Sequence, residues 1–171
     1  MTVAANTFES KTIDTLCERF AGFVAAETAG KQATAVVDKD KLRDVLTLLK
    51  TARDFGSAML TDLFIVDYFP RNPRFEAVYL LTSLDTKERV VLKVRLNDGE
   101  RLSTASDIFS SADWLEREAF DMFGIRFDNH PDMRRILMVE DFEGHPLRKD
   151  FPTEGYGFDK RFKVELEEEK R

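Results

Sequence analysis

Cysteine and histidine are scarce in this chain. Its 171 residues include one cysteine, Cys17, and two histidines. An iron–sulfur cluster or a closed zinc site takes about four protein ligands, most often thiolates. We therefore expect no redox cofactor and no metal bound by this chain alone. A single cysteine also excludes an intramolecular disulfide, which favours a reducing, cytosolic compartment.

Long apolar runs and an excess of positive charge are also missing. The longest stretches without a charged residue, 1–8 and 77–84, have eight residues each, against the ~20 that span a bilayer. We expect no membrane span and no secretory signal. With 26 basic and 32 acidic residues the net charge is −6, so nucleic acid is a poor candidate for a partner.

Periodic apolar patterns in the first 125 residues predict helices and strands. Spacings of i, i+3, i+4 and i+7 predict a helix over 13–24 and another through Leu42 and Leu49, with Asp38 and Asp40 as candidate caps. Strands are predicted at 33–37, 59–69, 75–84 and 89–96, the last three as an antiparallel meander. The predicted fold class is α+β, a two-layer sandwich of a mostly antiparallel sheet covered by helices.

Two further helix starts are predicted, at Thr104-x-x-Asp107 and Ser110-x-x-Asp113. The second leads into an apolar stripe that begins at Leu115 and stops at Gly124. The opposite side of this helix is charged and by itself is typical of a solvated face with an Arg117–Asp121 ion pair. Its charged residues are Glu116, Arg117, Glu118 and Asp121.

Residues 126–171 keep their apolar content but lose periodicity. Eight of the 15 phenylalanines lie at or beyond Phe109, and prolines and glycines interrupt the region. Disordered tails are normally poor in aromatic residues, and long structureless loops are uncommon inside compact domains. We therefore divide the chain into an α+β domain, 1–125, and an irregular extended C-terminal arm, 126–171, that buries its aromatic side chains against another protein.

Candidate catalytic chemistry is limited to His130 and His145. Each precedes a proline, and His130 has Asp128 and Asp132 nearby. An Asp–His pair could orient a general base, but a nucleophile elbow and a metal-binding H-E-x-x-H spacing are both missing. Anchoring of turns or of interface contacts is the favoured role. Gly155-Tyr156-Gly157 is too short a match for a nucleotide loop.

Two basic pairs, Arg134-Arg135 and Arg148-Lys149, stand out in an acidic chain. Arginine forms bidentate hydrogen bonds with carboxylates and is a preferred anchor at protein interfaces. A phosphate site is the competing interpretation, but it lacks a glycine-rich loop. We expect both pairs to contact a partner.

Two ordered blocks resemble a known family. The first runs from E-R-E-A-F-D-M-F-G-I, at 116–125, to H-P-D-M-R-R-I-L-M, at 130–138, and the second is E-D-F-E-G-H-P-L-R-K-D-F-P, at 140–152. They resemble the signature of the C subunit of proton-pumping NADH-quinone oxidoreductase, respiratory complex I. Phe142 stands where that family often has tryptophan.

The resemblance implies a non-catalytic subunit of the hydrophilic arm of that complex. Such a subunit packs against the D subunit and neighbouring iron–sulfur subunits, which lie at the cytoplasmic face of the bacterial inner membrane. FMN and iron–sulfur clusters in the partners would transfer electrons from NADH to quinone, coupled to proton translocation. The expected signature and interface residues are Glu116, Arg117, Glu118, Asp121, His130, Arg134, Arg135, His145, Arg148, Lys149 and Asp150.

Three alternatives stay open. The chain could be the equivalent subunit of a related complex of the plastoquinone, coenzyme F420-dependent or membrane-bound hydrogenase type. It could also be a free-standing enzyme that uses His130 or His145 with nearby carboxylates. A soluble adaptor that binds another partner through the same arm is the third.

Overall fold

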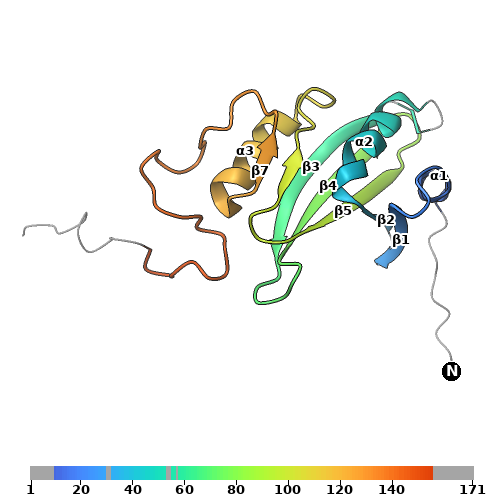
Figure 1. The fold of residues 1–171 in the computed structure, drawn as a ribbon. Helices are drawn as coiled ribbons and strands as arrows, with labels where there is room; N and C mark the ends of the chain where they lie inside the picture. Colours follow the sequence, from blue (N-terminus) through green and yellow to red (C-terminus); the bar gives the residue numbers. More distant parts are fainter. Residues whose placement is uncertain (1–9, 30–31, 53–54, 57, 156–171) are drawn as a thin grey trace, which may run out of the picture.

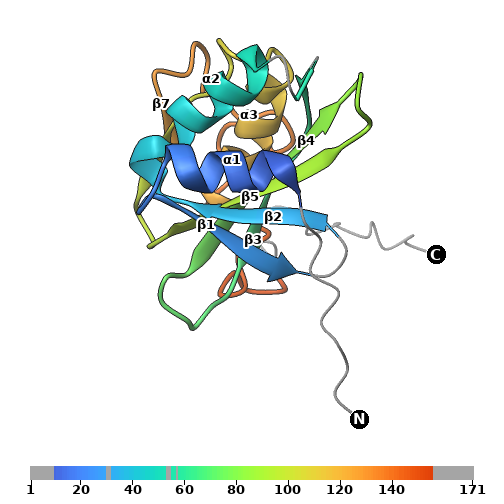
Figure 2. The same ribbon diagram turned by 90° about the vertical axis from the view of Figure 1, so that its right-hand side faces the viewer.

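The structure, a computed structural model, describes residues 10–29, 32–52, 55–56 and 58–155. Its centre is a mixed five-stranded sheet in the order β1-β2-β5-β4-β3. The strands are β1 (Val24–Ala29), β2 (Gln32–Val37), β3 (Ala58–Asp67), β4 (Phe75–Ser83) and β5 (Arg89–Leu96). The α1, α2 and α3 helices lie on one side of this sheet (Figure 2). The predicted α+β sandwich is confirmed.

Helix α1 (Lys11–Arg19) is shorter than its apolar stripe predicts. Ser10 caps it by accepting a hydrogen bond from the Ile13 amide at 3.3 Å. The prediction that the helix continues to Val24 is wrong, because Gly22 takes a left-handed conformation at φ +85°. Val24 instead begins β1, a strand that the periodicity did not reveal, and pairs with Val37 of β2.

Helix α2 and the central strands follow their patterns closely. After a short 3-10 turn, Lys39–Lys41, α2 (Leu42–Thr51) buries Leu42, Val45, Leu46 and Leu49. In β5 the alternate residues from Val90 to Leu96 are fully enclosed. The register of β3 against β4 shifts between Leu60 and Asp62, so Leu60 and Leu63 both face the core although they are three residues apart.

The antiparallel meander holds for β3, β4 and β5, but β2 joins β5 in parallel. A parallel pair needs a long connection, and here α2, β3 and β4 lie between the two strands. This crossover places α2 over the sheet. In the described residues, no helix combines the length and the apolar content that crossing a membrane requires.

A second, two-stranded parallel sheet pairs β6 (Arg101–Ser103) with β7 (Arg126–Asp128), and α3 (Ala112–Phe123) connects the two. The helix start predicted at Thr104 is wrong: residues 105–109 form a turn closed by the Phe109 amide on the Ala105 carbonyl at 2.8 Å. The predicted start at Ser110 is displaced, since Ser111 precedes the first residue of α3.

Residues 129–155 contain no helix or strand and wrap around the C-terminal end of α3 (Figure 1). Expectations that rest on Tyr156, Gly157 or later aromatic residues lie outside the described residues. The division into two domains at residue 125 stays a prediction.

Candidate functional site

The predicted site residues gather along α3 and the irregular segment that follows it. Two of them, Glu116 and Asp121, have side chains without exposed surface. The prediction that this stripe is a solvated face is therefore wrong for these two carboxylates. Glu118 does lie in solvent, as predicted.

Glu116 joins the N-terminal half of α3 to the turn after β6. Its carboxylate accepts hydrogen bonds from the Thr104 hydroxyl at 2.6 Å and from the Ala105 amide at 2.7 Å. Burial raises the pKa of Glu116 to about 7, although these two donors oppose the shift. The Thr104 hydroxyl, which the sequence predicts as a helix cap, thus donates to Glu116 instead.

The histidine beside Glu116 is held in one tautomer. The Nδ1 atom of His130 accepts from the Asp132 amide at 3.0 Å, which leaves the proton on Nε2. That nitrogen lies 3.1 Å from the Asp113 carbonyl oxygen and 3.9 Å from a Glu116 carboxylate oxygen. The imidazole has no exposed surface, so a substrate in solution would not reach it. Asp128 pairs with Arg101 instead.

Asp121 organises the backbone of the C-terminal segment. Its Oδ2 atom accepts from the amides of Ile136, Leu137 and Met138 at 3.1, 2.8 and 2.9 Å, and its Oδ1 accepts from Arg135 at 2.7 Å. Burial would raise the pKa of Asp121, but these four donors outweigh it and lower the pKa. This carboxylate holds three consecutive amides in place.

The predicted Arg117–Asp121 ion pair does not form. Arg117 donates to the Arg134 carbonyl at 3.1 Å and lies over the Trp114 ring. The partner of Asp121 is Arg135, which also donates to the carbonyls of Phe142 and Gly144 at 3.0 and 3.1 Å. One guanidinium therefore connects α3 to two turns of the segment.

His145 closes the C-terminal end of α3. Its Nδ1 atom lies 2.9 Å from the Asp121 carbonyl oxygen, and its ring meets Phe120 edge-on. Burial lowers the pKa of this imidazole. The ring packs where a side chain at Gly124 would stand: a Cβ atom there would lie 2.6 Å from the ring.

Gly124→Ala is expected to cost about 2 to 4 kcal/mol of unfolding free energy. The φ of +77° alone costs about 1 kcal/mol for alanine, and displacement of the His145 ring adds about 1 to 3 kcal/mol. Gly22→Ala is the control, because Gly22 has φ +85° but no atom within 4 Å of the added Cβ. Urea unfolding of both variants separates packing from backbone strain. Equal losses would contradict a packing role for His145.

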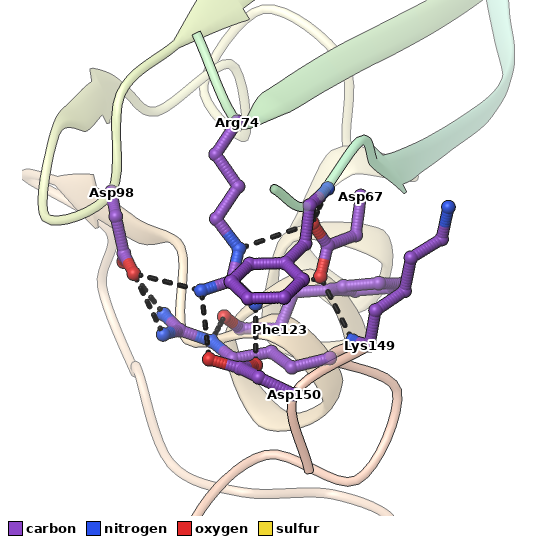
Figure 3. A network of polar contacts seen from close by, with 8 residues as sticks. Asp67, Arg74, Asp98, Phe123, Lys149 and Asp150 are labelled. Carbon is purple, nitrogen blue, oxygen red and sulfur yellow. Dashed lines mark hydrogen bonds and ion pairs between the residues drawn. The ribbon is translucent and has the colours of Figure 1, made fainter. Parts of the chain in front are cut away.

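A second polar cluster fastens the segment to the end of the sheet (Figure 3). Arg74 donates to Asp67 at 2.9 and 3.0 Å, to Asp150 at 2.5 and 3.0 Å and to Asp98 at 3.1 Å. The Lys149 amide donates to Asp67 at 2.9 Å. Arg148 donates to the Phe123 carbonyl at 2.6 Å and pairs with Asp98 at 3.2 Å. We name Asp67, Arg74, Asp98, Arg148, Lys149 and Asp150 the Arg74 cluster.

The pKa values of Asp67 and Arg74 are shifted so that both side chains stay charged. Burial would raise the pKa of Asp67, but the Arg74 guanidinium and the amides of Lys149 and Phe69 outweigh it and hold the pKa at about 2. Hydrogen bonds to Asp67 and Asp150 raise the pKa of Arg74. The ring of Phe75 lies under two guanidinium groups, with centroid distances of 4.8 Å to Arg74 and 5.2 Å to Arg148.

Sequence reasoning missed Asp67, Arg74 and Asp98 as site residues, and it assigned Thr104 to a helix cap instead of to Glu116. One signal was available, since Asp67 and Arg74 flank a proline-containing turn at the ends of two apolar strands. Some predicted site residues stay at the surface: Arg134 pairs there with Asp132, and the Lys149 side chain is exposed. The described residues contain no group of three or more Cys, His, Asp or Glu arranged to hold a metal ion.

Glu116→Gln is expected to flatten the pH dependence of stability. The folded pKa of about 7 lies above the ordinary value of 4.5. The stability contribution of Glu116 is therefore complete below about pH 4.5 and is lost as the pH rises through 7. The unfolding free energy of the glutamine variant minus that of the wild type should therefore increase by roughly 2 to 3 kcal/mol from pH 5 to pH 8. Urea titrations test this, with exposed Glu118→Gln as the control; parallel profiles would contradict it.

Comparison with known proteins gives a consistent result. The family model described as "Respiratory-chain NADH dehydrogenase, 30 Kd subunit" matches residues 35–157. The C subunit of NADH-quinone oxidoreductase from Citrifermentans bemidjiense is 44% identical over 142 residues, which cover 82% of this chain and 87% of that protein. The C subunit of the same enzyme from Trichlorobacter lovleyi is 49% identical over 123 residues, covering 71% and 75%.

A solved structure agrees with these relatives. One chain of the membrane-bound sulfane sulfur reductase, an archaeal respiratory membrane complex, superposes with a TM-score of 0.73 at 25% identity. The match covers 92% of this chain and 94% of that chain. The region matched by the family model includes Glu116, Asp121 and the Arg74 cluster. The chain therefore belongs to the family of the 30 kDa subunit of respiratory-chain NADH dehydrogenase.

Proposed function

We propose that this chain is a non-catalytic subunit of the peripheral arm of NADH-quinone oxidoreductase. One observation carries the proposal: the charged side chains of the family signature hold this chain's own backbone in place. Asp121 holds the amides of residues 136–138, and Arg135 and Arg148 donate to main-chain carbonyls. Groups used in this way shape a surface, because their hydrogen bonds are taken up within the chain.

The burial of the candidate catalytic side chains supports a structural role. The side chains of His130 and Glu116 have no exposed surface, so an enzyme that uses His130 is disfavoured on access. His145 is half-buried, and its Nδ1 atom already contacts the Asp121 carbonyl oxygen at 2.9 Å. Cys17 lies half-buried on α1. A single thiol does not fit the ligand set of an iron–sulfur cluster. FMN and the clusters that transfer electrons from NADH to quinone would then reside in partner subunits.

The proposal includes the place of the chain in the complex. The segment 129–155 would face the D subunit and neighbouring iron–sulfur subunits at the cytoplasmic side of the inner membrane. Association with the membrane would come through the complex, whose electron transfer is coupled to proton translocation. Relatives named as the C subunit of NADH-quinone oxidoreductase support this assignment.

A second candidate is the equivalent subunit of a related respiratory complex. The structural similarity to a chain of the archaeal sulfane sulfur reductase favours it specifically. The two candidates differ in the electron donor of the complex and agree on the role of this chain. Oxidation of NADH by the purified complex decides between them.

Affinity purification of the tagged chain from native membranes tests the proposal. We expect the chain to travel with flavin-containing and iron–sulfur subunits and with NADH-quinone oxidoreductase activity. Recovery only as a free monomer would overturn the scaffold role. Recovery with an unrelated soluble protein would favour the adaptor instead.

A further inference from the structure

Three apolar side chains on the segment 129–155 point into solvent. Leu137 and Val139 are each 60% exposed, and Leu147 is 54% exposed. We name these three residues the apolar crest. Isolated exposed apolar residues are normal on any protein, so the significance of the crest depends on its backbone and on the charges around it.

The backbone of the crest is fastened to α3. The Leu137 amide donates to the Asp121 carboxylate at 2.8 Å, and the Leu147 amide donates to the Met122 carbonyl at 3.1 Å. Since Asp121 and Met122 are consecutive residues, both leucine backbones lie against the same turn of the helix. Val139 belongs to a turn in which its carbonyl accepts from the Phe142 amide at 3.0 Å.

The charges around the crest are mainly acidic. Glu140 and Glu143 follow Val139 closely and are exposed; we name these two residues the acidic rim. Two arginines of the same segment are turned inward, Arg135 to Asp121 and Arg148 to Asp98, while Arg134 pairs with Asp132 at the surface. Arg134 and Lys149 are the exposed members of the two basic pairs, and the expectation that both pairs contact a partner stays a prediction.

We infer that the apolar crest and its acidic rim form the docking surface for a partner subunit that offers an apolar pocket edged by lysine or arginine. This inference rests on the proposed function and names the chemistry of the contact. Apolar side chains on a fixed backbone lose little conformational entropy on binding, which is how interface anchors work. The acidic rim would meet the basic edge and fix the orientation of docking.

Competitive assembly in cells tests the crest. A tagged Leu137→Ser/Val139→Ser chain is expressed beside an equal amount of differently tagged wild type, and the ratio of tags is measured in the purified complex. We expect the variant to be incorporated at least tenfold less than the wild type. Leu84→Ser is the matched control, because Leu84 is 50% exposed in the β4–β5 connection, and it should stay within twofold.

Charge reversal tests the rim independently. Glu140→Lys/Glu143→Lys should also lower incorporation, whereas the control Glu18→Lys, on the exposed side of α1, should not. Thermal unfolding of each purified full-length chain verifies folding, and the rim variant retains the test if the crest variant is unstable. Normal incorporation of folded crest and rim variants would overturn the inference.

The failures are distinguishable. If the wild-type chain is missing from the complex, the proposed function fails before the crest is tested. If the wild type enters the complex and the folded variants enter equally well, only the docking surface is wrong. If the wild-type chain forms dimers that Leu137→Ser/Val139→Ser disperses, the crest binds a second copy, and the inferred basic-edged partner is overturned.

Discussion

Replacing Asp121 by alanine is expected to remove about 3 to 5 kcal/mol of stability from the attachment of the C-terminal segment. The change leaves the largely buried Arg135 guanidinium without its carboxylate and the three amides of residues 136–138 without an acceptor. Loss of one partner from a buried, hydrogen-bonded ion pair usually costs this much. The melting temperature should fall on the order of 10 °C if the segment and the domain unfold together.

Hydrogen exchange distinguishes global from local loss. If the segment detaches as a unit, the decrease in the free energy of global unfolding is limited to the free energy with which the segment docks on the domain. The amides of residues 136–138 then exchange quickly. Glu118→Ala is the control, since Glu118 is an exposed carboxylate on the same helix, and it should change stability by less than about 0.5 kcal/mol. Slow exchange at 136–138 in Asp121→Ala would contradict the role assigned to Asp121.

Arg74→Met is expected to destabilise the protein by about 3 to 5 kcal/mol at pH 7. Asp67, whose side chain is 1% exposed, would keep its charge without its partner, and Asp150 would lose its link to the sheet. An unpaired buried charge is among the most costly changes in a folded protein. Arg71→Met removes an exposed arginine three residues away and should have little effect. Urea unfolding provides the measurement.

The pH dependence identifies the mechanism of that loss. In the wild type the pKa of Asp67 is held at about 2 against an ordinary 3.8. Its stability contribution, about 2 kcal/mol, is present above pH 4 and is lost as the pH falls through 2. In Arg74→Met the loss of the guanidinium lets burial raise the pKa of Asp67, so its carboxylate is protonated at a higher pH than in the wild type. The difference in unfolding free energy between the two proteins should therefore narrow toward pH 3. A constant gap would indicate lost packing against Phe75 instead of lost charge pairing.

Local patterns predicted those elements whose burial follows their own periodicity. Helix α2 and strands β4 and β5 lie within one or two residues of their predicted bounds, because alternate or i, i+3, i+4 positions face one core. The error at α1 has a local cause: Gly22 ends the apolar stripe in a turn, and Val24 then packs in the sheet. The parallel pairing of β2 with β5 joins residues more than 50 positions apart and has no local signal.

For the candidate site, too, the sequence predicted the local positions but not the long-range contacts. Position along α3 places Glu116, Glu118 and Asp121 correctly on the helix, but their polarity indicates solvent for all three. Two of them are buried because acceptors on α3 meet donors 11 to 17 residues away in the chain. Helical spacing considers only neighbours three or four residues apart, so Arg117 was paired with Asp121 where Arg135 is the partner.

The sequence by itself determined the family, through two ordered blocks, and the α+β class, through periodicity. With one cysteine, it also predicted that this chain alone does not supply the roughly four thiolates that an iron–sulfur cluster takes. Only the tertiary structure decided where the charges go. A carboxylate or a guanidinium satisfies its hydrogen bonds with whichever donors and acceptors the fold brings near, and in a buried site unsatisfied groups are costly. Arg135 and Arg148 therefore hold the segment from within, whereas Arg134, the apolar crest and its acidic rim are exposed.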